Sequence, residues 1–188
     1  MTKDEALRVF HDTGALLEGH FILRSGLRSR KYFQCALALQ DMPTVEKFGS
    51  EIATQCRGLG AVTVISPAMG GLVIGQEVAR QLKARFIFAE KEVGKLVLRR
   101  GFKIAPGEKI LVVEDVVTKG GRVAETLAIV KALGGEVVGV GMVVDRSGGT
   151  VDLGIPMFSV IKLAVETFSP DNLPADLAAI PAVVPGSK

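Results

Sequence analysis

Two adjacent carboxylates, Glu114 and Asp115, stand between an apolar run and a glycine-containing loop. Residues 109–126 read KILVVEDVVTKGGRVAET, which predicts a buried strand, an acidic pair, a Thr/Gly loop and the start of a helix. Carboxylates accept hydrogen bonds from sugar hydroxyls or bind a metal ion, but they repel phosphate. The loop at residues 118–121 offers backbone N–H groups to a phosphate. Together these sites indicate a ribose 5-phosphate ligand; the alternative is an ordinary strand–helix turn with solvated acids.

A second loop of the same kind lies earlier in the chain. Residues 66–71, SPAMGG, follow the apolar run 62–65 and precede a helical pattern, so they offer a second anion site. Neither loop fits the Walker pattern, and no G-x-G-x-x-G follows a strand, so those two nucleotide sites are not supported. Two anion loops on one sheet suit a ligand with a monophosphate at one end and a diphosphate at the other.

Basic residues gather in two further segments. Residues 90–103 carry five of them, and we expect a hairpin in which 96–98 pairs with 102–104 around Gly101, with Gly94 at a mobile tip. One interpretation is a lid that brings positive charge to a diphosphate leaving group and excludes water. The other is a solvated charged hairpin. Residues 24–31 hold four more basic residues, for which a solvated hairpin is again the simpler interpretation.

The hydrophobic pattern predicts the elements that position these residues. Thr2 and Glu5 have the spacing of a helix capping box. Helices are expected at 43–57, 71–82 and from 122 onward, and strands at 21–23, 32–35, 62–65, 86–89, 110–113, 136–144 and 159–164. This alternation predicts a doubly wound, mainly parallel α/β sheet. Arg146 follows the strand at 136–144, where such folds place ligand contacts.

Composition narrows the class of protein. The chain has 188 residues, 48% hydrophobic and 23% charged, which indicates one globular domain. A net charge of +3 suits an anionic substrate but is too small to indicate nucleic acid. Cys35 and Cys56 form no metal-binding or disulfide pattern, which indicates a reducing compartment. With no signal peptide or membrane-span pattern, we expect a cytoplasmic protein that binds neither membranes nor nucleic acid.

The sequence resembles a known family at several of these points. Residues 112–121, VVEDVVTKGG, resemble the phosphoribosyl diphosphate signature of the type I phosphoribosyltransferases. Residues 19–26 with Tyr32-Phe33, and residues 144–149, resemble the orotate phosphoribosyltransferases in their short bacterial and archaeal form, from about residue 13 to 167. The resemblance implies a twisted, mainly parallel sheet flanked by helices. It also implies one domain over 1–188, with a small hood formed mainly by 14–40 and the C-terminal segment, and a core at about 41–165.

The implied reaction transfers the 5-phosphoribosyl group from phosphoribosyl diphosphate to orotate in pyrimidine biosynthesis. The products are orotidine 5'-monophosphate and diphosphate. The resemblance also implies Mg²⁺, held mainly through the substrate with Asp115 as a possible ligand, and a homodimer in which residues 90–103 reach the neighbouring site.

The resemblance assigns roles to individual residues. Catalytic positions are Lys91 and Lys95. Orotate contacts are Tyr32, Phe33, Thr118 and Arg146. Phosphoribosyl diphosphate contacts are Arg24, Ala68, Met69, Gly70, Glu114, Asp115, Val116, Val117, Thr118, Lys119, Gly120, Gly121 and Arg122.

The chain departs from the family in three places. The mobile loop has no His, Gly70 stands where many members have Lys, and Arg24 stands where Lys is common. The choice of catalytic base among Lys91, Lys95, Arg99 and Arg100 therefore stays open. One alternative function is transfer to another base such as a purine, although Arg146 favours a carboxylated one. The other is a phosphoribosyl diphosphate-binding regulator, although no helix-turn-helix pattern precedes Gly19.

Overall fold

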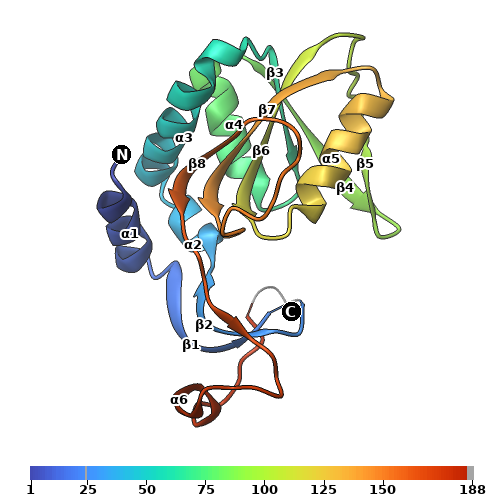
Figure 1. The fold of residues 1–188 in the computed structure, drawn as a ribbon. Helices are drawn as coiled ribbons and strands as arrows, with labels where there is room; N and C mark the ends of the chain where they lie inside the picture. The colour runs from blue at the N-terminus through green and yellow to red at the C-terminus, as the bar shows by residue number, and fades with distance from the viewer. Residues whose placement is uncertain (24, 186–188) are drawn as a thin grey trace.

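The computed structural model describes residues 1–23 and 25–185. The predicted substrate contact Arg24 lies outside these described residues. A six-stranded sheet has the order β5-β4-β3-β6-β7-β8, and all neighbours are parallel except β5, which runs antiparallel to β4 (Figure 1). Its strands are β3 Thr63–Pro67, β4 Arg85–Glu92, β5 Lys95–Leu98, β6 Lys109–Val117, β7 Glu136–Asp145 and β8 Met157–Lys162. The predicted α/β fold is confirmed.

Helices cover both faces of this sheet, as Figure 1 shows for α3 and α4 on one side and α5 on the other. On β6, Leu111 and Val113 join the buried cluster under α3 and α4, while Ile110 and Val112 join the cluster under α5. The apolar run is therefore buried on both faces, as its composition predicts. The helical elements are α1 Lys3–Asp12, α2 Cys35–Leu39, α3 Met42–Cys56, η1 Arg57–Leu59, α4 Gly71–Leu82, α5 Gly121–Ala132 and α6 Ala175–Ala178.

A smaller antiparallel sheet forms the hood, with the order β1-β2-β9. Its strands are β1 Leu16–Ile22, β2 Arg28–Phe33 and β9 Thr167–Phe168. The C-terminal segment joins it, because the Val183 N–H donates to the His20 carbonyl and the Val183 carbonyl accepts from Ile22, both at 2.8 Å. Figure 1 shows the hood below the edge of the main sheet at which β6 and β7 end. The domain limits predicted from the sequence stay a prediction.

The predicted helix cap at the N-terminus forms, whereas the predicted end of one hood strand differs. The Glu5 N–H donates to Thr2 Oγ1 at 3.2 Å and the Thr2 N–H donates to Glu5 Oε2 at 2.7 Å, so the capping box is confirmed. The strand predicted at 32–35 is too long, because β2 ends at Phe33 and Cys35 begins α2. This change of element carries the chain from the hood into the core.

The hairpin predicted around Gly101 is wrong. The observed hairpin pairs β4 with β5, with Glu92 opposite Lys95. Its turn is at Val93 and Gly94, which have φ of 46° and 84°. Gly101 also has a positive φ, 73°, but the chain after it forms no strand and packs instead through Phe102, whose ring lies 5.2 Å from that of Phe88.

Gly75 lets α4 pack closely on β3. A Cβ atom at Gly75 would collide with Ser66 Oγ and would lie 2.9 Å from Phe86 Cε2. We expect Gly75→Ala to lower the free energy of unfolding by about 1–3 kcal/mol, because Ser66 is fully buried and has little room to move. Urea denaturation measures the change. Gly58→Ala is the control, since a Cβ there meets nothing within 4 Å; equal stability of the two variants would contradict the packing argument.

Candidate active site

The acidic pair lies at the end of β6, directly beneath the loop that begins α4. A Cβ atom at Gly70 would stand 2.7 Å from Asp115 Oδ1, and one at Gly71 would stand 2.9 Å from the Val113 carbonyl oxygen and 3.1 Å from Glu114 Oε1. The contacts at 2.7 and 2.9 Å are too close for a side chain, so the two glycines allow the loop to approach the end of β6 and its carboxylates. The structure thus brings Gly70, Glu114 and Asp115 together. Gly71 was missed as a site position, although its place in a Gly-Gly pair before a helix could have indicated it.

The rest of this loop, residues 68 and 69, has backbone groups and no charged side chain with which to contact a ligand. The Ala68–Met69 peptide bond is cis, and Met69 is 81% exposed. The Ala68 N–H donates to the Ala89 carbonyl on β4 at 2.7 Å, which ties the loop to the neighbouring strand. Since residues 68–71 contain no cationic side chain, an anion here would depend on N–H groups and on cations from other segments.

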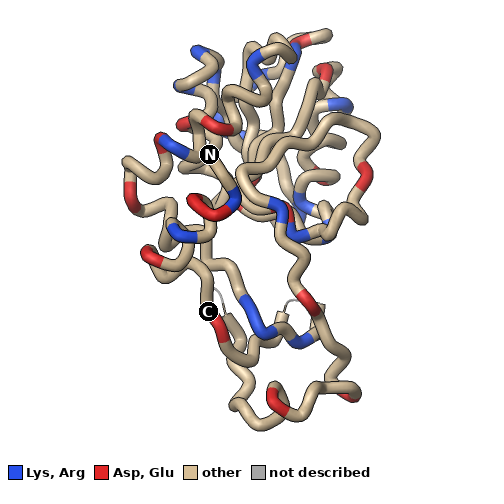
Figure 2. Tube along the Cα trace, turned by 60° about the vertical axis from the view of Figure 1, so that its left-hand side comes forward, with Lys and Arg blue, Asp and Glu red and all other residues tan. Residues whose placement is uncertain are grey.

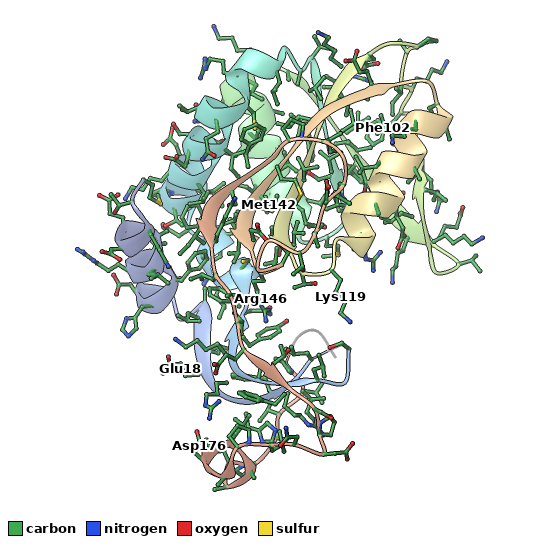
Figure 3. All side chains as sticks on the ribbon, in the orientation of Figure 1. Glu18, Phe102, Lys119, Met142, Arg146 and Asp176 are labelled. Carbon is green, nitrogen blue, oxygen red and sulfur yellow. The ribbon has the colours of Figure 1, made fainter. Side chains whose placement is uncertain are left out.

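The second loop leads from β6 into α5. Gly120 is the N-cap of α5 with φ of 72°, and a Cβ there would stand 2.9 Å from Val151 Cγ1. Figure 3 shows Lys119 extending from this loop toward the hood. Arg122, in the first turn of α5, has a buried Nη1 for which the described residues supply no hydrogen-bond partner. A cation at a helix N-terminus opposes the helix dipole, so its presence favours an anionic ligand.

Burial changes the ionisation of Glu114. The side chain is 6% exposed, and this burial, followed by the charge of Asp115, raises the pKa of Glu114 to about 9, while Arg122 acts in the opposite direction. At neutral pH Glu114 therefore holds a proton. Its carboxyl group can both donate a hydrogen bond to a ribose hydroxyl and accept one.

This pKa predicts a pH dependence of stability. The folded protein keeps the Glu114 proton up to about pH 9, whereas the unfolded chain loses it near pH 4.3. The folded state binds more protons between these values, so the stabilising contribution present at low pH is lost as pH rises toward 9. We expect Glu114→Gln to remove this loss and to gain stability relative to the original chain between pH 5 and 9. Urea denaturation at several pH values tests this; parallel curves for the two proteins would contradict it.

Arg146 lies at the same edge of the sheet. Its N–H donates to the Val117 carbonyl at 2.8 Å, and its Cζ lies 5.8 Å from the ring centroid of Phe33. The side chain is half-buried, its Nε has no hydrogen-bond partner among the described residues, and burial lowers its pKa. A guanidinium keeps its charge even so. Arg146 is therefore a desolvated cation that faces the hood (Figure 3) and suits a carboxylate.

Tyr32 and Phe33, the two aromatic residues predicted to contact orotate, differ in accessibility. Phe33 is 4% exposed, and its ring meets that of Phe10 edge-on at 5.4 Å. It thus supports Arg146 from within the core. Tyr32 is half-buried, and its ring lies 5.8 Å from that of Phe21. Figure 2 shows basic residues on the lower edge of the core and on the adjoining hood strands, which suits an anionic ligand between them.

The predicted catalytic lysines are placed apart from this group. Lys91 and Lys95 are exposed on the β4–β5 hairpin, which projects outward beside α5 and to one side of the hood (Figure 1). In the described part of the chain, neither lysine forms an ion pair with Glu114 or Asp115. The remaining predicted contacts run from the end of β6 to the first residue of α5, directly after the acidic pair: Val116, Val117, Thr118 and Gly121.

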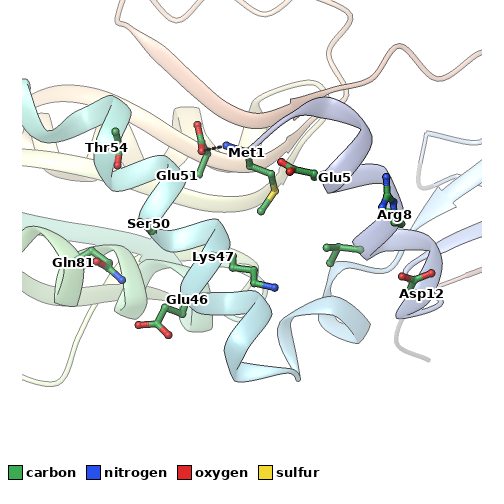
Figure 4. Close-up of a pocket in the computed structure, with 11 residues that line it drawn as sticks. Met1, Glu5, Arg8, Asp12, Glu46, Lys47, Ser50, Glu51, Thr54 and Gln81 are labelled. Atoms are coloured by element: carbon green, nitrogen blue, oxygen red, sulfur yellow. Dashed lines mark hydrogen bonds and ion pairs between the residues drawn. The ribbon is translucent and has the colours of Figure 1, made fainter.

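The described part of the chain holds no group of three or more His, Cys, Asp or Glu side chains suited to a metal, and none of its helices has the length and apolar character needed to cross a bilayer. A cavity of about 740 Å³ between α1 and α3 contains the ion pair of the Met1 ammonium with Glu51, at 2.5 Å (Figure 4). None of the predicted site residues lines it.

Comparison with known proteins identifies the family. The phosphoribosyl transferase domain model matches residues 36–171. The orotate phosphoribosyltransferase of Desulforamulus reducens is 50% identical over 188 residues, covering 100% of this chain and 98% of the relative. The chain belongs to the orotate phosphoribosyltransferase family.

Solved structures agree with this family fold. The orotate phosphoribosyltransferase of Aeropyrum pernix matches with a TM-score of 0.68 and 26% identity, covering 83% of this chain and 92% of that one. An adenine phosphoribosyltransferase from Thermoanaerobacter pseudethanolicus matches with a TM-score of 0.63 and 19% identity, covering 71% and 88%. The type I phosphoribosyltransferase fold is confirmed, but fold alone does not select the base.

Proposed function

We propose that this chain is an orotate phosphoribosyltransferase that converts orotate and phosphoribosyl diphosphate to orotidine 5'-monophosphate and diphosphate in pyrimidine biosynthesis. The observation that carries the proposal is the desolvated guanidinium of Arg146, next to Phe33 and at the same sheet edge as the acidic pair. A purine brings no carboxylate to satisfy it. Given its family and the composition of the chain, we place the enzyme in the cytoplasm.

The geometry suggests how the substrates bind. Glu114 and Asp115 would hydrogen-bond the ribose hydroxyls, residues 117–121 would hold the 5-phosphate, and residues 68–71 would hold the diphosphate through N–H groups. Tyr32 and Thr118 would border the pyrimidine, with its carboxylate on Arg146. The separation of the two anion loops by the acidic pair matches a ribose with a phosphate group at each end.

The chemistry needs charge stabilisation more than a nucleophile. The bond between ribose C1 and the diphosphate oxygen breaks with its electron pair on the diphosphate. A ring nitrogen of orotate bonds to C1, and its proton passes to the departing diphosphate or to solvent. C1 has oxocarbenium character in between, and negative charge grows on the leaving group. Lys91 and Lys95 would stabilise that charge, and closure of the hairpin would exclude water.

The donor set also fits Mg²⁺ held mainly by the substrate. Mg²⁺ sites commonly use one or two carboxylates together with phosphate oxygens, and Asp115 supplies one such carboxylate. When bound, Mg²⁺ would neutralise charge on the diphosphate.

We further propose a homodimer in which each β4–β5 hairpin serves the neighbouring site. The outward direction of the hairpin in Figure 1 supports this. Mixing the two impaired variants Lys91→Ala and Asp115→Asn should give more activity than either variant alone, because some mixed dimers contain one intact site. No recovery after exchange of subunits would refute a shared site.

Asp115→Asn tests the ribose contact. We expect phosphoribosyl diphosphate to bind about tenfold to a hundredfold more weakly, since a charged acceptor of the hydroxyl hydrogen bonds is lost. Titration calorimetry measures the affinity. Asp171→Asn, at an exposed position far along the chain, is the control for the charge change. Unchanged affinity in Asp115→Asn would remove Asp115 from the ribose site.

The function itself is tested by mixing the protein with phosphoribosyl diphosphate and Mg²⁺ and following loss of orotate by ultraviolet absorbance. Hypoxanthine, adenine and uracil are run in parallel. We expect loss of orotate alone. Turnover of a purine instead would overturn the assignment of Arg146, and binding of phosphoribosyl diphosphate without any turnover would favour a regulator.

A further inference from the structure

The β4–β5 hairpin divides its basic residues into two classes. Arg100 Nη2 lies 3.0 Å from Glu90 Oε2, and Arg99 Nη1 lies 3.0 Å from Glu92 Oε1. Arg99 Nε also lies 3.9 Å from Glu90 Oε1, so each oxygen of Glu90 faces one arginine. In the described part of the chain, Lys91 and Lys95 form no ion pair. The arginine charges are thus neutralised within the hairpin and the lysine charges are not.

Glu90 is the centre of this arrangement. Its side chain is 22% exposed, against 49% for Glu92, so its charge is less screened by water. Alternation along β4 puts Phe88 and Glu90 on one face and Lys91 on the other. Arg100 contacts both members of that face, since its Cζ also lies 5.6 Å from the centroid of the Phe88 ring.

The backbone after β5 is shaped to make these contacts. Arg100 has φ of 58° and Gly101 has φ of 73°, which turns the chain back toward β4. The Phe102 N–H donates to the Arg99 carbonyl at 3.0 Å, and the Phe102 ring packs on Phe88. A non-glycine residue at positive φ is uncommon, so the ion pair and the ring contact accompany an unfavourable backbone conformation.

The group formed by Glu90, Arg99 and Arg100 also lies next to the loop at residues 68–71. Ala89, the residue before Glu90, accepts the hydrogen bond from the Ala68 N–H at 2.7 Å. Glu90 is therefore one residue from the point where β4 supports residues 68–71. A shift of β4 at Glu90 would alter both the hairpin and the loop proposed to hold the diphosphate.

We propose that Glu90 is a positioning residue: by holding Arg99 and Arg100 against β4, it fixes the base of the hairpin and leaves Lys91 and Lys95 as the cations available to the diphosphate. The proposal rests on the proposed function and chooses among the four bases of the hairpin. Exposed ion pairs add little to overall stability, so the effect belongs in catalysis and in hairpin order.

Glu90→Gln tests the proposal, because it keeps the size of the side chain and removes its charge. We expect kcat to fall about tenfold or more with the KM for orotate unchanged, since misplacing catalytic groups is costly even without lost contacts. Trypsin cleavage after Arg99 and Arg100 should become faster by about threefold or more, because the segment is no longer held. Glu90→Asp should restore most of the kcat. Glu136→Gln, an exposed position at the start of β7, is the control and should behave as the original chain.

An unchanged kcat in Glu90→Gln would overturn the proposal, as would an equal loss in Glu136→Gln. A similar loss in Glu90→Asp and Glu90→Gln, without faster cleavage, would also overturn it. The cleavage experiment needs no substrate. An original chain inactive on every base would therefore refute the proposed function separately, and cleavage unchanged in Glu90→Gln would then overturn the anchoring role.

Discussion

Arg146→Gln should lower kcat/KM for orotate by about a hundredfold or more. The guanidinium is half-buried and its Nε has no hydrogen-bond partner among the described residues, so the orotate carboxylate would lose two charge-assisted hydrogen bonds in a partly desolvated site. Arg146→Lys should recover only part of the activity, because an ammonium cannot make the same bidentate contact. Steady-state kinetics with orotate varied measures the change.

The control for this prediction is Arg57→Gln, at an exposed position in η1. Binding of phosphoribosyl diphosphate by Arg146→Gln should stay near that of the original chain, which would separate loss of the base contact from loss of the fold. If Arg146→Gln keeps its kcat/KM for orotate, the carboxylate is held elsewhere and the reason for preferring orotate to a purine disappears.

The second large effect is expected at the hairpin. Lys91→Ala should lower kcat about a hundredfold and leave the KM for orotate nearly unchanged, because the lysine would act on charge that develops on the leaving diphosphate. Lys131→Ala, on the exposed face of α5, removes the same charge without touching the hairpin. Unchanged turnover in Lys91→Ala would remove it from the catalytic set and direct attention to Lys95.

Elements with a strong local pattern were predictable. The apolar run before Glu114 predicts a strand buried on both faces. The structure confirms this, because Leu111 belongs to the buried cluster on one face of the sheet and Ile110 to the cluster on the other. The hairpin was not predictable, because Gly94 and Gly101 are equally able to turn the chain and only the pairing of Glu92 with Lys95 decides between them. Local propensity does not contain that pairing.

Burial of the site residues was also not predictable from the sequence. The sequence identifies the acidic and basic side chains of the site, but not how deeply each is buried. Glu114 retains a proton at neutral pH because the loop at Gly71 covers it, and Arg146 is desolvated because Phe33 from the hood lies against it. Both effects depend on contacts between segments distant in the chain, which periodicity does not report.

The most direct test of the central claim is a crystal structure of this protein with orotidine 5'-monophosphate. The account predicts the base carboxylate within hydrogen-bonding distance of the Arg146 guanidinium, the ribose hydroxyls on Glu114 and Asp115, and the phosphate in the loop at residues 117–121. A carboxylate bound away from Arg146, or a phosphate bound at residues 68–71, would contradict it.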